Sequence, residues 1–335
     1  MPHPKARLFL AFGLALFAVS SAPAANAGES VRHRFVTLGT GSPSGVYYAA
    51  GRAICDAVDR TAERQAAAGD DIVTLCRYGP SGGSVFNIRQ VSTGAFTFAI
   101  VQANDQRAAV DGLDPQRIRA VPNLRSVLLL QPEMMQVVLP PDSTIRTVAD
   151  FAGKRISSGN RGSGTRLMTD QLLRAYGLSD DDFAAVENLT MEMEATTLCS
   201  GEVDVFVTVS AAPTQSVTDA IERCNARLMP LQGPEIDALL GRSRGLIGVQ
   251  VPPGAYRTVD SPVPTIGVRA GLVTREEVPE EIVRDVVSAV IDGLPILHAA
   301  HPSLEPLRPQ DMHPDGVGAP VHEGARAYFE QQQRQ

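Results

Sequence analysis

Tryptophan is absent from this chain of 335 residues, and aromatic residues make up only 5% of it. A carbohydrate site built from stacked aromatic rings is therefore not expected. A basic run is missing too, and the formal net charge is -7, so nucleic acid is not an expected partner. Hydrophobic residues make up 44% and charged residues 20%, as in ordinary globular proteins, and the length allows two lobes.

Long apolar runs are missing beyond Val19, where no stretch approaches the roughly 18 apolar residues of a membrane-spanning helix. The run from Leu8 to Val19 is itself too short to span a bilayer of about 30 Å. It follows two basic residues and precedes Ala25-Asn26-Ala27, whose small side chains suit a signal peptidase. We interpret residues 1–27 as a cleaved secretory signal peptide and expect a mature protein that is soluble outside the cytoplasm. An N-terminal membrane anchor is the alternative.

The four cysteines, Cys55, Cys76, Cys199 and Cys224, include no CxxC motif and no zinc-ribbon spacing, so no metal site is predicted. An even number of cysteines in an exported chain indicates disulfide bonds. The simplest of the three connectivities joins neighbouring segments, Cys55 with Cys76 and Cys199 with Cys224. The other two connectivities, and four free buried thiols, remain open at this point.

Strand-like and helix-like segments alternate along the mature chain, which predicts an α/β fold. The first block is predicted to hold strands at 35–38, 71–76 and 96–101, with helices at 47–60 and 81–91. The middle block is predicted to hold strands at 124–130, 134–139, 154–157, 203–209 and 228–231, with a helix at 166–176. Pro132 separates the first two of these strands. The tail returns with a strand at 265–273 and a helix at 279–294. Each block has polar turns at strand ends, which predicts two lobes whose strand ends face each other.

Three turns rich in glycine and hydroxyl side chains open predicted helices. They read GTGSPSGVYY at 39–48, GPSGGSVFN at 79–87 and GSGTR at 162–166. Glycine lets the backbone turn sharply and approach a ligand, and the start of a helix favours an anion. The first turn is not a dinucleotide fingerprint, and no Walker lysine follows it. A fourth polar turn, at 208–214, follows a predicted strand. Together the four turns predict a cleft that receives a small anion.

An enzyme is the alternative. The second turn formally matches the GxSxG nucleophile elbow, which would make the chain a secreted α/β serine hydrolase that uses Ser81. Only a short stretch of mature chain precedes this turn, and no HGGG-like oxyanion segment lies upstream. Ser81 serves equally well as a helix cap. We therefore expect no catalysis, no cofactor and no metal.

Five segments together resemble the TAXI-type solute-binding proteins of TRAP transporters. Residues 39–48 with Gly51 resemble the opening signature of that family, and residues 81–87 resemble its second signature. Residues 94–102, 153–166 and the tail from Pro306 to Phe329 follow in matching order, so the likeness covers nearly the whole mature chain. Both local cysteine pairs look like those of some exported relatives.

The resemblance implies a bilobed periplasmic-binding-protein fold of type II topology, with crossing hinge strands and a ligand cleft between two αβ lobes. Lobe I would hold residues 28–130 and 266–335, and lobe II would hold residues 131–265. The protein would be periplasmic and monomeric, and would deliver a glutamate-like amino acid or an oxo-dicarboxylate to TRAP permease subunits driven by an ion gradient. A ligand-sensing module for a membrane kinase would use the same cleft with a different partner.

The predicted ligand contacts lie on the polar turns and on the strand ends beside them. Hydroxyl and amide side chains would act as hydrogen-bonding groups, and one of two arginines would act as the charge partner of a carboxylate. These candidates are Thr40, Ser42, Tyr47, Ser84, Asn87, Gln102, Arg161, Ser163, Thr165 and Arg166.

Overall fold

The computed structural model describes Met1, residues 31–113 and residues 118–334. The predicted signal peptide, residues 1–27, lies outside the described residues apart from Met1. Within the described chain, no helix is both long enough and apolar enough to cross a membrane.

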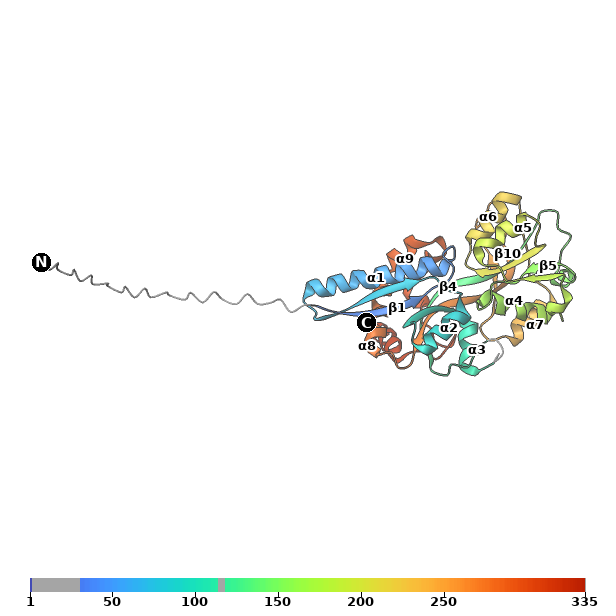
Figure 1. Ribbon diagram of the computed structural model, residues 1–335. Helices are drawn as coiled ribbons and strands as arrows, with labels where there is room; N and C mark the ends of the chain where they lie inside the picture. The colour runs from blue at the N-terminus through green and yellow to red at the C-terminus, as the bar shows by residue number, and fades with distance from the viewer. Residues whose placement is uncertain (2–30, 114–117, 335) are drawn as a thin grey trace. The chain divides into compact units, whose positions relative to one another are not determined.

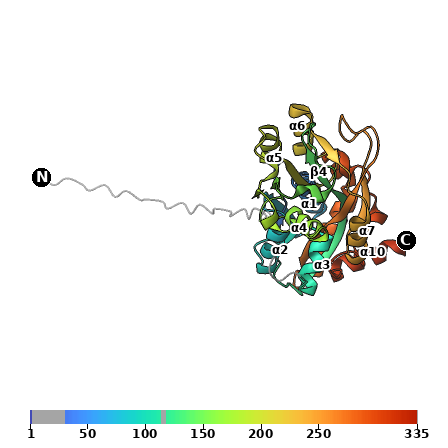
Figure 2. The ribbon, with the colours of Figure 1, turned by 90° about the vertical axis from the view of Figure 1, so that its right-hand side faces the viewer.

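The strands of the described chain form one mixed sheet in the order β2-β1-β3-β10-β4-β7-β5-β6, with β8 on β4 and β9 on β10 (Figure 1). Their bounds are β1 Arg32–Gly39, β2 Ile72–Gly79, β3 Phe98–Gln102, β4 Leu124–Leu139, β5 Arg155–Ser157, β6 Ala185–Glu187, β7 Val205–Ser210, β8 Arg227–Met229, β9 Ile247–Val251 and β10 Val263–Arg275. Helices pack on the sheet, and their bounds are α1 Val46–Ala68, α2 Ser84–Thr93, α3 Ala103–Asp111, α4 Gly164–Ala175, α5 Met191–Cys199, α6 Gln215–Cys224, α7 Pro234–Arg242, α8 Glu280–Asp292, α9 Leu294–Ala300 and α10 Glu323–Gln333 (Figures 1 and 2). The predicted α/β class is confirmed.

The antiparallel strands β4 and β10 are shared by both halves of the sheet. One end of β10 pairs with β3 and the other with β9, while the far end of β4 pairs with β7. The predicted break at Pro132 is wrong, because β4 runs through this residue without interruption. The strand continues because Pro132 stands opposite Arg269, where the register shifts before Gly271, and such an irregularity tolerates a residue without an N–H group. The lobe boundaries predicted near residues 130 and 265 fall inside these two strands.

The side chains of the inner strands alternate between two apolar layers. Phe98 and Ile100 of β3 point into the core formed with α1 and α8, whereas Ala99 and Val101 point into the core formed with α2 and α3. All four side chains are buried. A sheet that is covered by helices on both faces buries both sides of its inner strands, so these strands are continuous apolar runs that can be predicted from the sequence.

Six helices were not predicted from the sequence: α3, α5, α6, α7, α9 and α10. In α5 the reason is clear, because its buried face includes Glu194 and Thr197 beside Ala195 and Leu198. Polar residues on the inner face hide the apolar period that predicts a helix.

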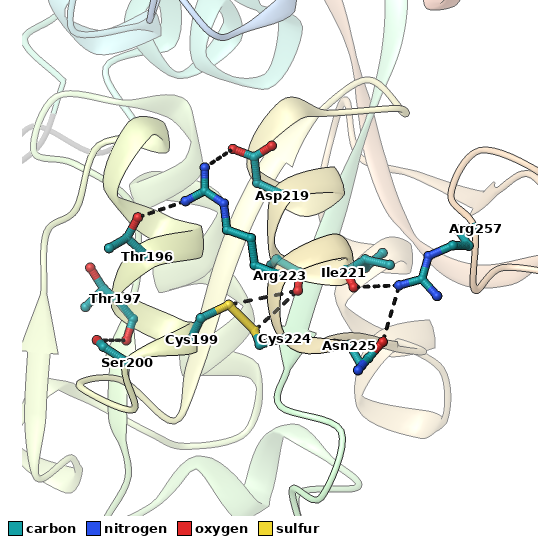
Figure 3. The surroundings of a disulfide bond; sticks show 11 residues. Thr196, Thr197, Cys199, Ser200, Asp219, Ile221, Arg223, Cys224, Asn225 and Arg257 are labelled. Carbon is teal, nitrogen blue, oxygen red and sulfur yellow. Dashed lines mark hydrogen bonds and ion pairs between the residues drawn. A yellow bond between two sulfur atoms is a disulfide. The ribbon is translucent and has the colours of Figure 1, made fainter.

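Both disulfide bonds join neighbouring segments, with the pairing that the sequence analysis favoured. Cys55 of α1 is bonded to Cys76 of β2, with 4.9 Å between the Cα atoms. Cys199 at the end of α5 is bonded to Cys224 at the end of α6, with 5.5 Å between the Cα atoms (Figure 3). Beside the second bond, Arg223 donates to Thr196 and pairs with Asp219, so α5 and α6 are linked by more than sulfur.

Candidate functional site

A cavity of about 220 Å³ lies where the carboxyl ends of several strands meet the starts of four helices. The residues before α1 and α2 border it, and so do the starts of α4 and α5. Its other walls are the last residues of β3 and β7 and the middle of β4. The lining includes Ser42, Tyr47, Gly83, Ser84, Gln102, Glu133, Ser163, Thr165, Glu192, Glu194 and Ser210.

Three of the four helix starts carry no acidic residue in their first turns. These are α1 after Gly45, α2 after Gly83 and α4 after Ser163, and each of the three cap residues borders the cavity. The first backbone N–H groups of a helix have no partner within it and carry a partial positive charge. The cavity wall at these three helix starts therefore suits an anionic group.

Glycine is required where α2 approaches α4. Gly83 has a φ of 96°, in the region that residues with side chains rarely adopt. A Cβ atom at Gly83 would also lie 3.3 Å from the Cα of Ser163. The absence of a side chain thus lets the two helix starts lie against each other.

Six of the ten predicted contact residues border the cavity: Ser42, Tyr47, Ser84, Gln102, Ser163 and Thr165. Two of their hydroxyl groups also hold the framework, since Ser84 accepts a hydrogen bond from the Gln102 N–H and Thr165 accepts one from the Val209 N–H, each 3.1 Å long. The structure thus brings residues from the first three polar turns to one place.

Thr40 and Asn87 do not border the cavity. The side chains of Thr40 and Asn87 are both fully buried. The Thr40 hydroxyl donates to the carbonyl of Gly79 over 2.6 Å. Asn87 donates to the carbonyls of Thr40 and Ile100, at 2.7 and 2.9 Å. These two residues fasten the first turn to β3.

Neither predicted arginine borders this cavity. Arg166 is buried and pairs with Asp180 at 2.7 Å and with Asp170 at 3.0 Å. Arg161 is exposed, and it lines a different cavity together with Arg166. In the described lining of the first cavity there is no arginine, lysine or histidine.

The charged side chains of the lining are carboxylates instead of the expected arginine. Glu133 and Glu194 are the most buried of them. Glu133 lies on β4 and is 2% exposed. Its Oε2 accepts hydrogen bonds from the Tyr47 hydroxyl at 2.8 Å and from Gln102 at 3.1 Å. Burial raises the pKa of Glu133 to about 7, although these two hydrogen bonds oppose the rise. A lone acid inside an apolar strand was the signal that the sequence analysis missed.

Glu192 and Glu194 come from the first turn of α5. Glu192 accepts hydrogen bonds from Ser42 and Ser44, which connects α5 to the turn after β1. Glu194 is 1% exposed, and its Oε2 has no hydrogen-bond partner among the described residues. Burial raises the pKa of Glu194 to about 8.

Asp105 lies behind Gln102, outside the cavity lining, and is also buried. Burial, and then the negative charge of Glu133, raise its pKa to about 8. Asp105, Glu133 and Glu194 are thus three buried carboxyl groups whose pKa values of about 8, 7 and 8 lie near neutral pH.

Ser81 borders the cavity as well, but its hydroxyl donates to the carbonyl of Thr40 and accepts from the Gly83 N–H. A serine nucleophile needs a neighbouring base, and no histidine is part of the described lining. The described residues also contain no cluster of three metal-ligating side chains.

The fold is that of periplasmic binding proteins. A protein from Bordetella bronchiseptica RB50 superposes with a TM-score of 0.54 at 14% identity, over 89% of this chain and 98% of that one. The periplasmic binding protein BugD superposes with a TM-score of 0.51 at 13% identity, over 90% of this chain and 94% of that one. A candidate L-cystine ABC transporter from Listeria monocytogenes superposes with a TM-score of 0.50 at 12% identity, over 82% of this chain and 97% of that one.

The sequence itself matches a family profile over residues 38–332, from the end of β1 to α10. The matched region contains all four polar turns, the four cysteines and every residue of the cavity lining. With this match, the chain belongs to the NMT1-like family.

Proposed function

We propose that this protein is an extracytoplasmic solute-binding protein that binds a small organic molecule in the first cavity and delivers it to a membrane transporter. One observation carries the proposal. A small cavity is bordered by three helix starts free of acidic residues and also by the buried carboxyl groups of Glu133 and Glu194. The fold of periplasmic binding proteins is consistent with this role.

The solute we propose carries a carboxylate and an ammonium group, as a glutamate-like amino acid does. The helix starts would receive the carboxylate. Glu133 and Glu194 would receive the ammonium, because a buried carboxylate is stabilised by an opposite charge. An oxo-dicarboxylate brings no positive charge, and the described lining offers none in return. The amino acid is therefore favoured over the oxo-dicarboxylate.

The transporter we propose is a TRAP permease, with this chain as its TAXI-type component. The support is the resemblance of residues 39–48 and 81–87 to the two signatures of that family, together with the place of Ser42, Tyr47 and Ser84 in the lining. A permease of the ABC type and a membrane kinase that senses the solute are the alternatives. Uptake of the solute by proteoliposomes that contain either a TRAP permease or an ABC permease, measured with and without this protein, decides among them, and a sensor would support uptake by neither.

Calorimetry on residues 28–335 tests the solute class. An ammonium group favours ionised Glu133 and Glu194, so an amino acid should release protons on binding near pH 7. An oxo-dicarboxylate would favour their protonated forms and take protons up. Titrations of L-glutamate and 2-oxoglutarate in buffers of different ionisation enthalpy give the sign. Proton uptake with L-glutamate, or tighter binding of 2-oxoglutarate, would contradict the amino acid proposal while leaving the binding function in place.

A further inference from the structure

A second cavity, of about 370 Å³, lies behind the turn at 162–164. It is bordered by α2, by the segment 161–167 and by residues around Asp180 and Asn188. Ser163 borders both cavities, so this turn is the wall between them. The starts of α2 and α4 meet at this turn, where the Phe86 N–H donates to the carbonyl of Gly162 over 3.0 Å.

Three arginines border this second cavity: Arg89 of α2, Arg161 of the turn and Arg166 of α4. The cavity has one acidic side chain in its described lining, Asp180, and Arg166 already donates to both of its oxygens, at 2.8 and 2.7 Å. Arg166 also donates to Ser158 at 2.7 Å, so its guanidinium is held in place.

Arg89 and Arg161 are different, because neither guanidinium has an ion pair or a hydrogen bond with a described residue. Both residues are exposed, and they reach the cavity from different elements, α2 and the turn before α4. Two unneutralised positive charges therefore border one concave polar site beside a fixed third arginine.

We propose that this second cavity binds a small oxyanion between Arg89 and Arg161. A guanidinium group presents paired N–H donors that match two oxygens of a phosphate, sulfate or carboxylate. The ordered Arg166–Asp180 pair forms the floor of the site, and Asn188 adds a polar side chain to its wall. The anion would contact α2 on one side and the turn at 161–163 on the other, which links the two elements. The proposal does not depend on which solute the first cavity binds.

The test uses residues 28–335 and three oxyanion probes, which are inorganic phosphate, sulfate and acetate. Chloride at the same ionic strength is the reference. The midpoint of thermal unfolding and titration calorimetry report binding. We expect at least one of the three oxyanions to raise the midpoint above that in chloride. In the double variant Arg89→Gln/Arg161→Gln, its dissociation constant should rise about tenfold or more. Arg174→Gln is the matched control, because Arg174 is an exposed arginine of α4 outside the lining, and it should bind as the wild type does.

Three results would overturn the second site. The first is equal midpoints in all four salts, and the second is undiminished oxyanion binding by the double variant. The third is competition between the oxyanion and L-glutamate in the wild type, combined with loss of oxyanion binding in Thr165→Ala, which would place the anion in the first cavity. Far-ultraviolet circular dichroism of each variant verifies that it is folded before binding is compared.

Discussion

The hydroxyl of Tyr47, in the first turn of α1, donates a 2.8 Å hydrogen bond to Oε2 of Glu133 in the middle of β4. Both side chains are buried, and both border the first cavity. This bond favours the ionised carboxylate, so Tyr47 holds the pKa of Glu133 below the value that burial alone would produce.

Tyr47→Phe should therefore weaken the binding of L-glutamate at about pH 7 by about tenfold, because Glu133 becomes protonated more easily. The loss should shrink at about pH 9, where Glu133 is ionised even without the hydrogen bond. Calorimetric titrations at both pH values measure it. Tyr48→Phe is the control, since Tyr48 packs against Tyr78 outside the cavity lining. An equal loss at both pH values would contradict this role of Tyr47.

Glu194→Gln should lower the affinity for L-glutamate about tenfold or more, because the ammonium loses a charged partner in a buried site. The same change should stabilise the solute-free protein at about pH 8, because it removes a buried carboxylate with an unpartnered oxygen. Calorimetry and urea unfolding measure the two effects. Glu222→Gln, an exposed change on α6, should produce neither. A variant that binds normally would remove Glu194 from the site.

The solute-free protein should lose stability as the pH rises from about 4 to about 8 through its buried acids. Glu133, Asp105 and Glu194 have folded-state pKa values of about 7, 8 and 8, above the value of about 4 in an unfolded chain. Between these limits the folded state binds more protons than the unfolded state, so the slope of stability against pH is negative. Comparing the urea unfolding of the wild type and of Glu194→Gln across this pH range isolates the contribution of Glu194 to the free energy of unfolding. The stability difference between the two proteins should grow with pH, and a constant difference would refute the shift.

Replacing Cys199 and Cys224 together by serine should cost roughly 3 kcal/mol of unfolding free energy, because the bond closes a loop with a sequence separation of 25 residues. Solute affinity should change little, since neither sulfur borders the first cavity. Urea unfolding and calorimetry measure the two quantities. Peptide mapping without reductant is the check on the pairing, and a cross-link between Cys55 and Cys199 would contradict it.

The protein should also return its solute unchanged. Ser81 has backbone partners only, and the described lining has no histidine to act as its base. Chromatography of L-glutamate after long incubation with the protein checks this. More than one equivalent of a new product, lost in Ser81→Ala, would favour the hydrolase.

The parts of the fold that could be predicted are those in which local pattern and tertiary position agree. The buried strands β3 and β7 are continuous apolar runs, and the turns before α1, α2 and α4 are marked by glycine and serine. These features depend on residues that are close together in the sequence, so they can be predicted without the structure.

The charge of the site could not be predicted in this way. Arg166 stands beside a predicted turn, but its guanidinium points to Asp180 and Asp170. Glu133 and Glu194 reach the cavity only because β4 and α5 meet there, far from the three turns in sequence. Long-range packing decides which charged side chain enters a cavity, so a local sequence motif cannot predict it.

The position of β10 between β3 and β4 also bears on how the chain folds. The strands β3 and β4 are not hydrogen-bonded to each other in the described sheet, and each pairs with β10 instead. Until Val263–Arg275 has been synthesised, the two halves of the sheet have no strand to join them. Contacts between residues so distant in sequence form late and slowly. A chain with this topology therefore stays unassembled at its centre during most of its synthesis, because the strand that joins the two halves of the sheet is among the last to be made.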